Sequence, residues 1–134
     1  MRKGVIAFFA LALGVVAAAA PAMAHHSFAA EFDANKPVTL KGYVTKIEWT
    51  NPHVWFYLDV KQPDGTVQNW GFEMGPPHGL QARGWTRTTM KLGDEIEVAG
   101  TRAKNGSTRG NARTVTMVST GQRLGAASSE GQNP

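Results

Sequence analysis

Alternation between apolar and polar residues dominates the middle of the chain. From Val38 to Thr50 the apolar residues fall on every second position, with one slip near Thr45-Lys46. Such alternation is typical of a β-strand with one buried face, and a slip of one residue predicts a β-bulge. Residues 53–61 alternate without a slip, so one of their two sets of side chains should point out of the core. The two sets are Val54, Phe56, Leu58 and Val60, and His53, Trp55, Tyr57 and Asp59.

Turn-forming residues divide this pattern into five predicted strands. Asn51-Pro52, Pro63-Asp64-Gly65 and Asn105-Gly106 are each typical of a turn or a hairpin. The predicted strands are residues 38–50, 53–61, 67–74, 95–100 and 111–119. We expect the glycine- and proline-rich residues 75–79 to be irregular, and residues 80–85 to form a short helical turn.

Five short strands with a helical turn between the third and the fourth predict an all-β fold. This layout is that of a Greek-key barrel of the oligonucleotide/oligosaccharide-binding (OB) type. A long, bulged first strand fits such a barrel, because that strand must curve to pair with neighbours on both sides. A small open β-sandwich is the alternative.

The two ends of the chain differ in composition from the predicted barrel. A positively charged start, an apolar run from Val5 to Ala20 and the small residues Ala22 and Ala24 predict a cleaved secretory signal peptide over residues 1–24. We expect residues 25–37 to form an N-terminal arm, residues 38–120 the OB-like domain and residues 121–134 a disordered tail. The expected location is the periplasm, with no stable membrane span after processing.

Charge and cysteine content exclude several kinds of function. Removal of Arg2 and Lys3 with the signal peptide lowers the formal net charge from +4 to +2. This charge is too small for a nucleic-acid partner. The chain has no cysteine, which excludes disulfides, thiolate metal sites and thiol catalysis.

Histidine is the strongest candidate for chemistry. Cleavage after Ala24 would leave His25 at the N-terminus, with His26 next to it. An α-amine and imidazole nitrogens together suit copper(II), and His53 at the Asn51-Pro52 turn is the expected further ligand. The α-amine together with the amide nitrogen and the ring of His26 could also bind copper without any contribution from the folded domain. In the alternative without metal, the two N-terminal histidines form a soluble chain end and His53 caps a turn.

Aromatic residues are the second candidate. On an OB-type barrel the second and third strands form the usual ligand face, where exposed rings stack on a ligand. We expect most of the aromatic residues to lie in the core. The candidate ligand-binding residues are Trp49, Trp55, Tyr57 and His78. Such a module would bind a partner protein, a haem-like cofactor or a glycan.

Support for catalysis is weak, and the sequence favours a protein that is not an enzyme. Neither a nucleophile elbow nor a glycine-rich phosphate loop is present. Glu48 and Glu73 lie on neighbouring predicted strands, on either side of the turn at residues 50–53. They could approach each other as an acid–base pair. A copper-dependent redox enzyme using the same histidine nitrogens is the remaining enzymatic hypothesis.

Several motifs resemble those of a known family. They are Ala24-His25-His26-Ser27-Phe28, Glu48-Trp49-Thr50-Asn51-Pro52-His53-Val54-Trp55, Trp70-Gly71-Phe72-Glu73-Met74 and Gly93-Asp94. Together they resemble a family of small exported bacterial proteins of unknown function. The resemblance implies a periplasmic, barrel-like domain and implies no activity.

Overall fold

A computed structural model describes residues 28–127. The chain divides into two units, residues 1–30 and 31–134, and the account below concerns the second. Its strands are β1 (Phe32–Glu48), β2 (Trp55–Lys61), β3 (Val67–Glu73), β4 (Glu95–Ala103), β5 (Arg109–Met117) and β6 (Arg123–Gly125), and its helix is α2 (Pro77–Ala82).

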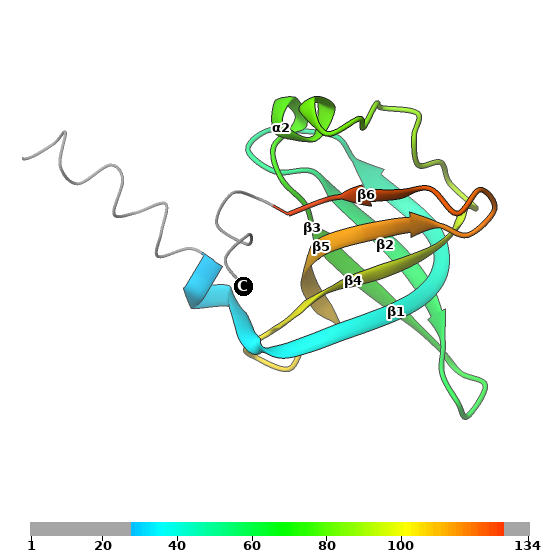
Figure 1. Cartoon of the computed structure of the whole chain (residues 1–134). Helices are drawn as coiled ribbons and strands as arrows, with labels where there is room; N and C mark the ends of the chain where they lie inside the picture. Colours follow the sequence, from blue (N-terminus) through cyan, green and yellow to red (C-terminus); the bar gives the residue numbers. More distant parts are fainter. Residues whose placement is uncertain (1–27, 128–134) are drawn as a thin grey trace, which may run out of the picture. The chain divides into compact units, whose positions relative to one another are not determined.

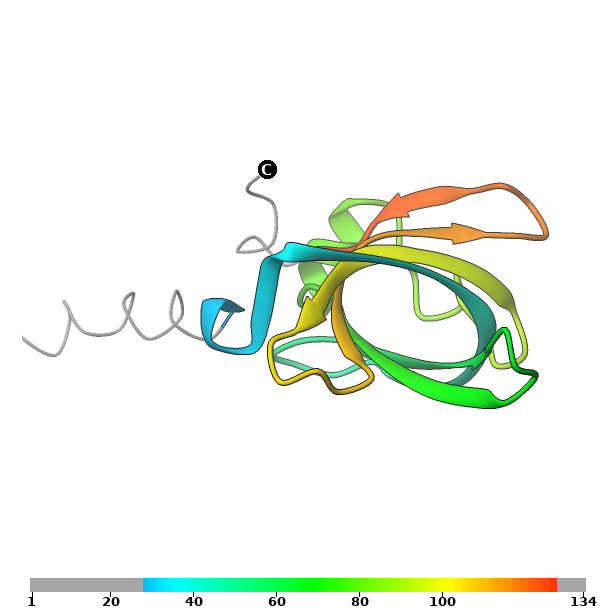
Figure 2. The same cartoon turned by 90° about the horizontal axis from the view of Figure 1, so that it is seen from below.

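The strands form a closed ring. Antiparallel pairing gives the order β3-β2-β1-β4-β5-β6, and a parallel pairing between β3 and β5 closes the sheet. Figure 2 shows the ring of strands nearly end-on. Five strands paired in this order, with α2 between β3 and β4 (Figure 1), make an OB-like barrel, so the predicted fold class is confirmed. The open sandwich is excluded because the β3–β5 pairing joins its two edges.

Strand β1 is long because it pairs with two strands, one on each of its sides. Its first part pairs with β4 and its last part with β2. The predicted bulge is confirmed, since the register with β2 shifts between Val44 and Lys46. At the bend, a Cβ on Gly42 would lie 2.4 Å from the carbonyl oxygen of Asp59. Only glycine allows the two strands to approach so closely here.

The interior of the ring holds the apolar set of each strand. Val54, Phe56, Leu58 and Val60 are buried, so the opposite set of β2 faces outward, as the alternation requires. Trp70 and Phe72 from β3 stack with each other in this core, with ring centroids 6.0 Å apart. Of the aromatic residues expected mostly in the core, Trp70, Phe72 and Trp85 are buried, whereas Trp49, Trp55 and Tyr57 are half-buried.

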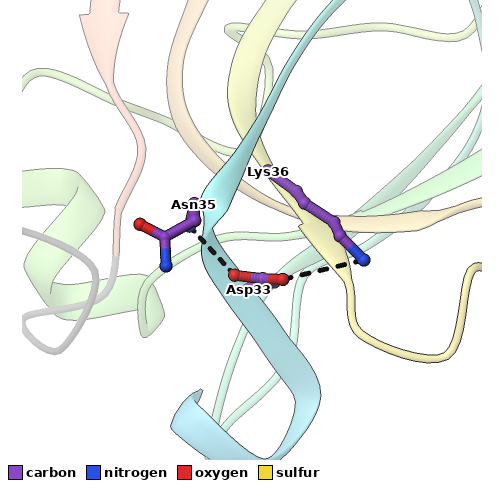
Figure 3. A network of polar contacts seen from close by, with 3 residues as sticks. All are labelled: Asp33, Asn35 and Lys36. Atoms are coloured by element: carbon purple, nitrogen blue, oxygen red, sulfur yellow. Dashed lines mark hydrogen bonds and ion pairs between the residues drawn. The ribbon is translucent and has the colours of Figure 1, made fainter.

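The predicted N-terminal arm is wrong in its second half, because β1 begins at Phe32. Phe32 is buried and pairs with Ala103 of β4, so the barrel extends beyond the alternating segment. Between Phe32 and Pro37 the register shifts, and side chains hold this irregular stretch. Asp33 accepts a hydrogen bond from the backbone N–H of Asn35 at 3.0 Å and pairs with Lys36 at 3.7 Å (Figure 3).

The helix begins earlier than predicted. Residues 77–79, expected to be irregular, lie within α2, which ends at Ala82. Proline is tolerated in the first helical turn because its missing N–H has no intrahelical acceptor there, and Pro77 occupies this place. The predicted hairpins are confirmed between β2 and β3 and between β4 and β5, with positive φ angles at Gly65 and Gly106.

The predicted disordered tail is wrong for residues 121–127. Residues 123–125 form β6, which pairs with β5, and Ala126 and Ala127 are buried. The indole N–H of Trp85 donates to the carbonyl oxygen of Gly125 at 2.8 Å, so a distant side chain holds this segment. Residues 128–134, the signal peptide and the start of the arm lie outside the described residues. Between residues 28 and 127 no helix is long and apolar enough to span a membrane.

Candidate functional site

The outward side chains of β2 form the centre of the candidate site. Trp55, Tyr57 and Asp59 are half-buried, and His53 lies just before the strand with the same parity. Two backbone hydrogen bonds fix this end of β2, one from Val54 N–H to the Gly75 oxygen and one from Met74 N–H to the Val54 oxygen. The ladder with β3 therefore continues past Trp55, which holds His53 beside β3.

His53 is paired with a carboxylate. Its Nδ1 lies 2.6 Å from Oε1 of Glu73, the residue that pairs with Trp55 across β2 and β3. The Glu73 side chain is only 11% exposed, whereas the His53 side chain is 30% exposed. A nearly buried carboxylate therefore anchors an imidazole that is itself partly exposed.

This pairing sets the chemistry of the ring. When His53 is neutral, the contact requires the proton on Nδ1, because the Glu73 carboxylate is an acceptor. The lone pair is then on Nε2. A histidine whose other nitrogen donates to a carboxylate is the usual arrangement of a metal ligand, since the carboxylate fixes the tautomer and raises the basicity of the ring.

A second polar group lies on the neighbouring strand. Lys46 Nζ is 2.6 Å from Oε1 of Glu48, and the Tyr57 hydroxyl donates to Oε2 of the same carboxylate at 3.1 Å. The hydrogen bonds from Lys46 and Tyr57 lower the pKa of Glu48. Burial and the hydrogen bond to Glu48 raise the pKa of Tyr57.

The aromatic rings of this face are partly covered by cations. Trp55 and Tyr57 stack with centroids 6.5 Å apart. Arg109 of β5 lies over the Trp55 ring at 5.5 Å, and Lys46 lies over the Tyr57 ring at 5.2 Å. Gly71 of β3 leaves room for this arrangement, because a Cβ there would come within 2.9 Å of the Tyr57 ring.

A buried polar row continues around the outside of the barrel. Glu73 pairs with Asn111 of β5, and Asn111 pairs with Thr101 of β4. These three are the buried polar residues found among residues 28–127. Asn111 is 3% exposed, and its Nδ2 finds no hydrogen-bond partner in that part of the chain.

Comparison with known proteins gives a family and no activity. The model of a family described as "Family of unknown function (DUF6152)" matches residues 12–113. The chain belongs to the DUF6152 family. No curated protein matches it.

One solved structure similar to this DUF6152 chain is the N-terminal domain of PriB from Thermoanaerobacter tencongensis, described as dimeric. The identity is 22%, the alignment covers 63% of this chain and 97% of that one, and the TM-score is 0.45. The strand pairing of the DUF6152 chain defines its fold.

The structure brings together only some of the residues predicted for a site. His53, Trp55 and Tyr57 share one outer surface. Trp49 is instead half-buried and packs against the core. His78 is exposed on α2, and within residues 28–127 no hydrogen bond, ion pair or ring contact links it to the other three.

The predicted copper ligands His25 and His26 lie outside the described residues. Within the described part of this DUF6152 chain, no group of three or more His, Cys, Asp or Glu side chains is arranged to hold a metal ion. His53 therefore stands there as a single oriented imidazole, and its role as a ligand stays a prediction.

The suggested pairing of Glu48 with Glu73 is not formed. Both pair with Trp55, one from β1 and one from β3, so their Cα atoms are two strands apart, about 10 Å. Each carboxylate contacts a different side chain, Lys46 for Glu48 and His53 for Glu73. The two are thus placed to hold different side chains.

Neither Arg109 nor Asn111 was among the predicted site residues. Both lie on β5, which is far from β2 in the chain and reaches this face only through the β3–β5 pairing. The contact of Glu73 with His53 had a weak signal in the sequence, because Glu73 and His53 bracket two strands joined by a hairpin. Arg109 stood out only as one of several basic residues in the second half of the chain, and nothing in the sequence paired it with Trp55.

Proposed function

We propose that this DUF6152 protein is an exported binding protein for copper(II) and that His53 is a ligand supplied by the barrel. The observation that carries the proposal is the contact between His53 Nδ1 and Glu73 Oε1 at 2.6 Å. The contact through Nδ1 leaves Nε2 as the nitrogen for a metal, and the His53 side chain is partly exposed.

Nitrogen ligands favour copper over the alternatives. The chain has no cysteine, and the described residues offer no carboxylate cluster of the kind that binds magnesium or calcium. Imidazole and amine nitrogens bind copper(II) more tightly than other divalent first-row metals. After export and cleavage before His25, we expect the α-amine and ring of His25, with His26, to supply further nitrogen ligands.

The test is a copper(II) titration of residues 25–134 with the native N-terminus, followed by calorimetry against a competing chelator. His53→Ala should weaken binding by more than about tenfold, because loss of a ligand should cost at least as much as loss of its supporting hydrogen bond. Glu73→Gln should weaken it by about 10- to 100-fold.

His78→Ala is the matched control, because His78 is exposed on α2 and makes no ion pair within residues 28–127. It should leave the affinity unchanged. If His53→Ala and His78→Ala behave alike, the barrel supplies no specific ligand and any copper is held by the chain end alone. Electron paramagnetic resonance gives a second readout, since loss of a nitrogen ligand changes the copper hyperfine splitting.

A further inference from the structure

We propose that the outer face of the barrel carries a second site, which binds the carboxylate group of a small organic acid through Arg109 beside Trp55. This site is distinct from the copper site and needs no metal. Three observations support it: Arg109 is exposed, it lies over the Trp55 ring, and the Trp55–Tyr57 pair is only half-buried.

Arg109 is an exposed cation without a carboxylate in direct contact. Between residues 28 and 127 no carboxylate lies within ion-pair distance of it. Lys46, the other cation over this aromatic pair, contacts Glu48 at 2.6 Å. The hydrogen bonds from Lys46 and Tyr57 lower the pKa of Glu48 most, and the charge of Arg109 adds only a weaker, longer-range attraction. Arg109 therefore keeps its hydrogen-bond donors available to a further anion.

The Trp55 ring attracts Arg109 without using its hydrogen-bond donors. The guanidinium carbon lies 5.5 Å from the ring centroid, within the range of a cation–π contact. Such a contact is an attraction between a charge and a ring, so the N–H donors of the guanidinium stay available. A carboxylate accepts two such N–H groups in parallel, and the match in geometry favours it over a spherical anion.

The rings next to Arg109 supply the apolar part of the site. Trp55 and Tyr57 are both half-buried and stack with their planes 23° apart. Because Arg109 lies over the Trp55 ring, an acid with an aromatic or aliphatic body would contact the exposed part of this pair while its carboxylate reaches Arg109. A neutral molecule with the same body would lack the charge-assisted hydrogen bonds to Arg109.

The experiment uses metal-free, ¹⁵N-labelled protein, titrated with benzoate and, separately, with benzyl alcohol as the neutral probe. Indole N–H signals are followed by NMR, and Trp55→Phe assigns the Trp55 signal. Benzoate should shift the Trp55 signal saturably and leave those of Trp70 and Trp85 in place, since both rings are buried. Benzyl alcohol should bind at least about fivefold more weakly, because it lacks the charge that strengthens the hydrogen bond.

Arg109→Gln should weaken benzoate binding about tenfold, as expected for the loss of a charge-assisted, bidentate contact. Arg102→Gln is the matched control, because Arg102 also lies over a tryptophan, Trp70, at 5.1 Å, but that ring is only 5% exposed. The proposal is overturned if benzoate does not bind, if benzyl alcohol binds equally well, or if the two arginine variants lose affinity alike. Because no copper is present, these outcomes are independent of the proposed copper site.

Discussion

His53 owes its orientation to a partner on another strand. The Asn51-Pro52 turn marks a local feature, but the carboxylate that fixes the ring is Glu73, brought alongside by the pairing of β2 with β3. A histidine at a turn is unremarkable in sequence. Its pairing with a nearly buried carboxylate distinguishes it from His78, which is exposed on α2.

At the same scale, the hydrogen bonds to Glu48 predict how two substitutions change the pKa of its carboxyl. Lys46→Met should raise the pKa of the Glu48 carboxyl, because the hydrogen bond from Lys46 contributes most to lowering it. Tyr57→Phe should raise it by less, since the Tyr57 hydrogen bond is the second cause. Carboxyl carbon NMR across the acidic range measures both, and Lys36→Met, which removes a cation paired with Asp33 instead, is the control.

The sign of the effect on stability follows from the direction of the shift. A carboxyl whose folded-state pKa lies below its unfolded value stabilises the fold above the unfolded pKa, and this contribution is lost as the pH falls through the folded pKa. The stability difference between the wild type and Glu48→Gln should therefore shrink on acidification through that range. A constant difference from neutral to strongly acidic pH would contradict this account.

At the scale of elements, glycines mark where strands come too close for a side chain. A Cβ on Gly110 of β5 would lie 2.6 Å from the Phe72 ring and 2.7 Å from the carbonyl oxygen of Thr101. Gly110→Ala should therefore lower the free energy of unfolding by about 1–3 kcal/mol, the cost typical of overpacking. Urea unfolding measures this difference.

Gly79→Ala provides the comparison for this prediction. Gly79 lies in α2, where a Cβ would be 3.5 Å from Pro76, an ordinary contact. Alanine is favoured over glycine in a helix by about 0.5–1 kcal/mol, so this variant should be as stable as the wild type or slightly more. Equal destabilisation by both substitutions would show that the contacts of Gly110 are not the cause.

Elements with strong local patterns were predicted, and those without were missed. The alternation in β2 and the Asp64-Gly65 and Asn105-Gly106 turns predicted strands and hairpins that the structure confirms. Strand β6 has three residues and one large apolar side chain, Leu124, so it has no period to detect. Its ladder with β5 and the hydrogen bond from Trp85 hold it in place, and both are long-range contacts.

At the scale of the whole molecule, the copper proposal depends on processing. We predict that the exported protein begins at His25, because Ala22 and Ala24 supply the small residues that signal peptidase requires. Intact-mass spectrometry of protein recovered from the periplasm measures this directly. A chain that begins at Met23 would contradict the proposed amine ligand, because His25 would then have no free α-amine.

A variant tests whether that amine matters. Ala24→Leu places a large side chain at the cleavage position and should block processing before His25. The protein should then retain its signal segment. It should also lose the part of its copper affinity that the α-amine of His25 provides. The benzoate site should be unaffected, since Arg109 and Trp55 both belong to strands of the barrel.

The sequence by itself determined the all-β class, the bulge in the first strand and the division of β2 into two opposite faces, because these follow from period and turn chemistry within short segments. Only the tertiary structure decided that Glu73 holds His53, that Arg109 lies on Trp55 and that Glu48 and Glu73 stand apart. These contacts depend on strand register and on the closure of the ring by β3 and β5. A linear pattern fixes which face a side chain takes, whereas its neighbour on that face is chosen by the pairing of distant strands.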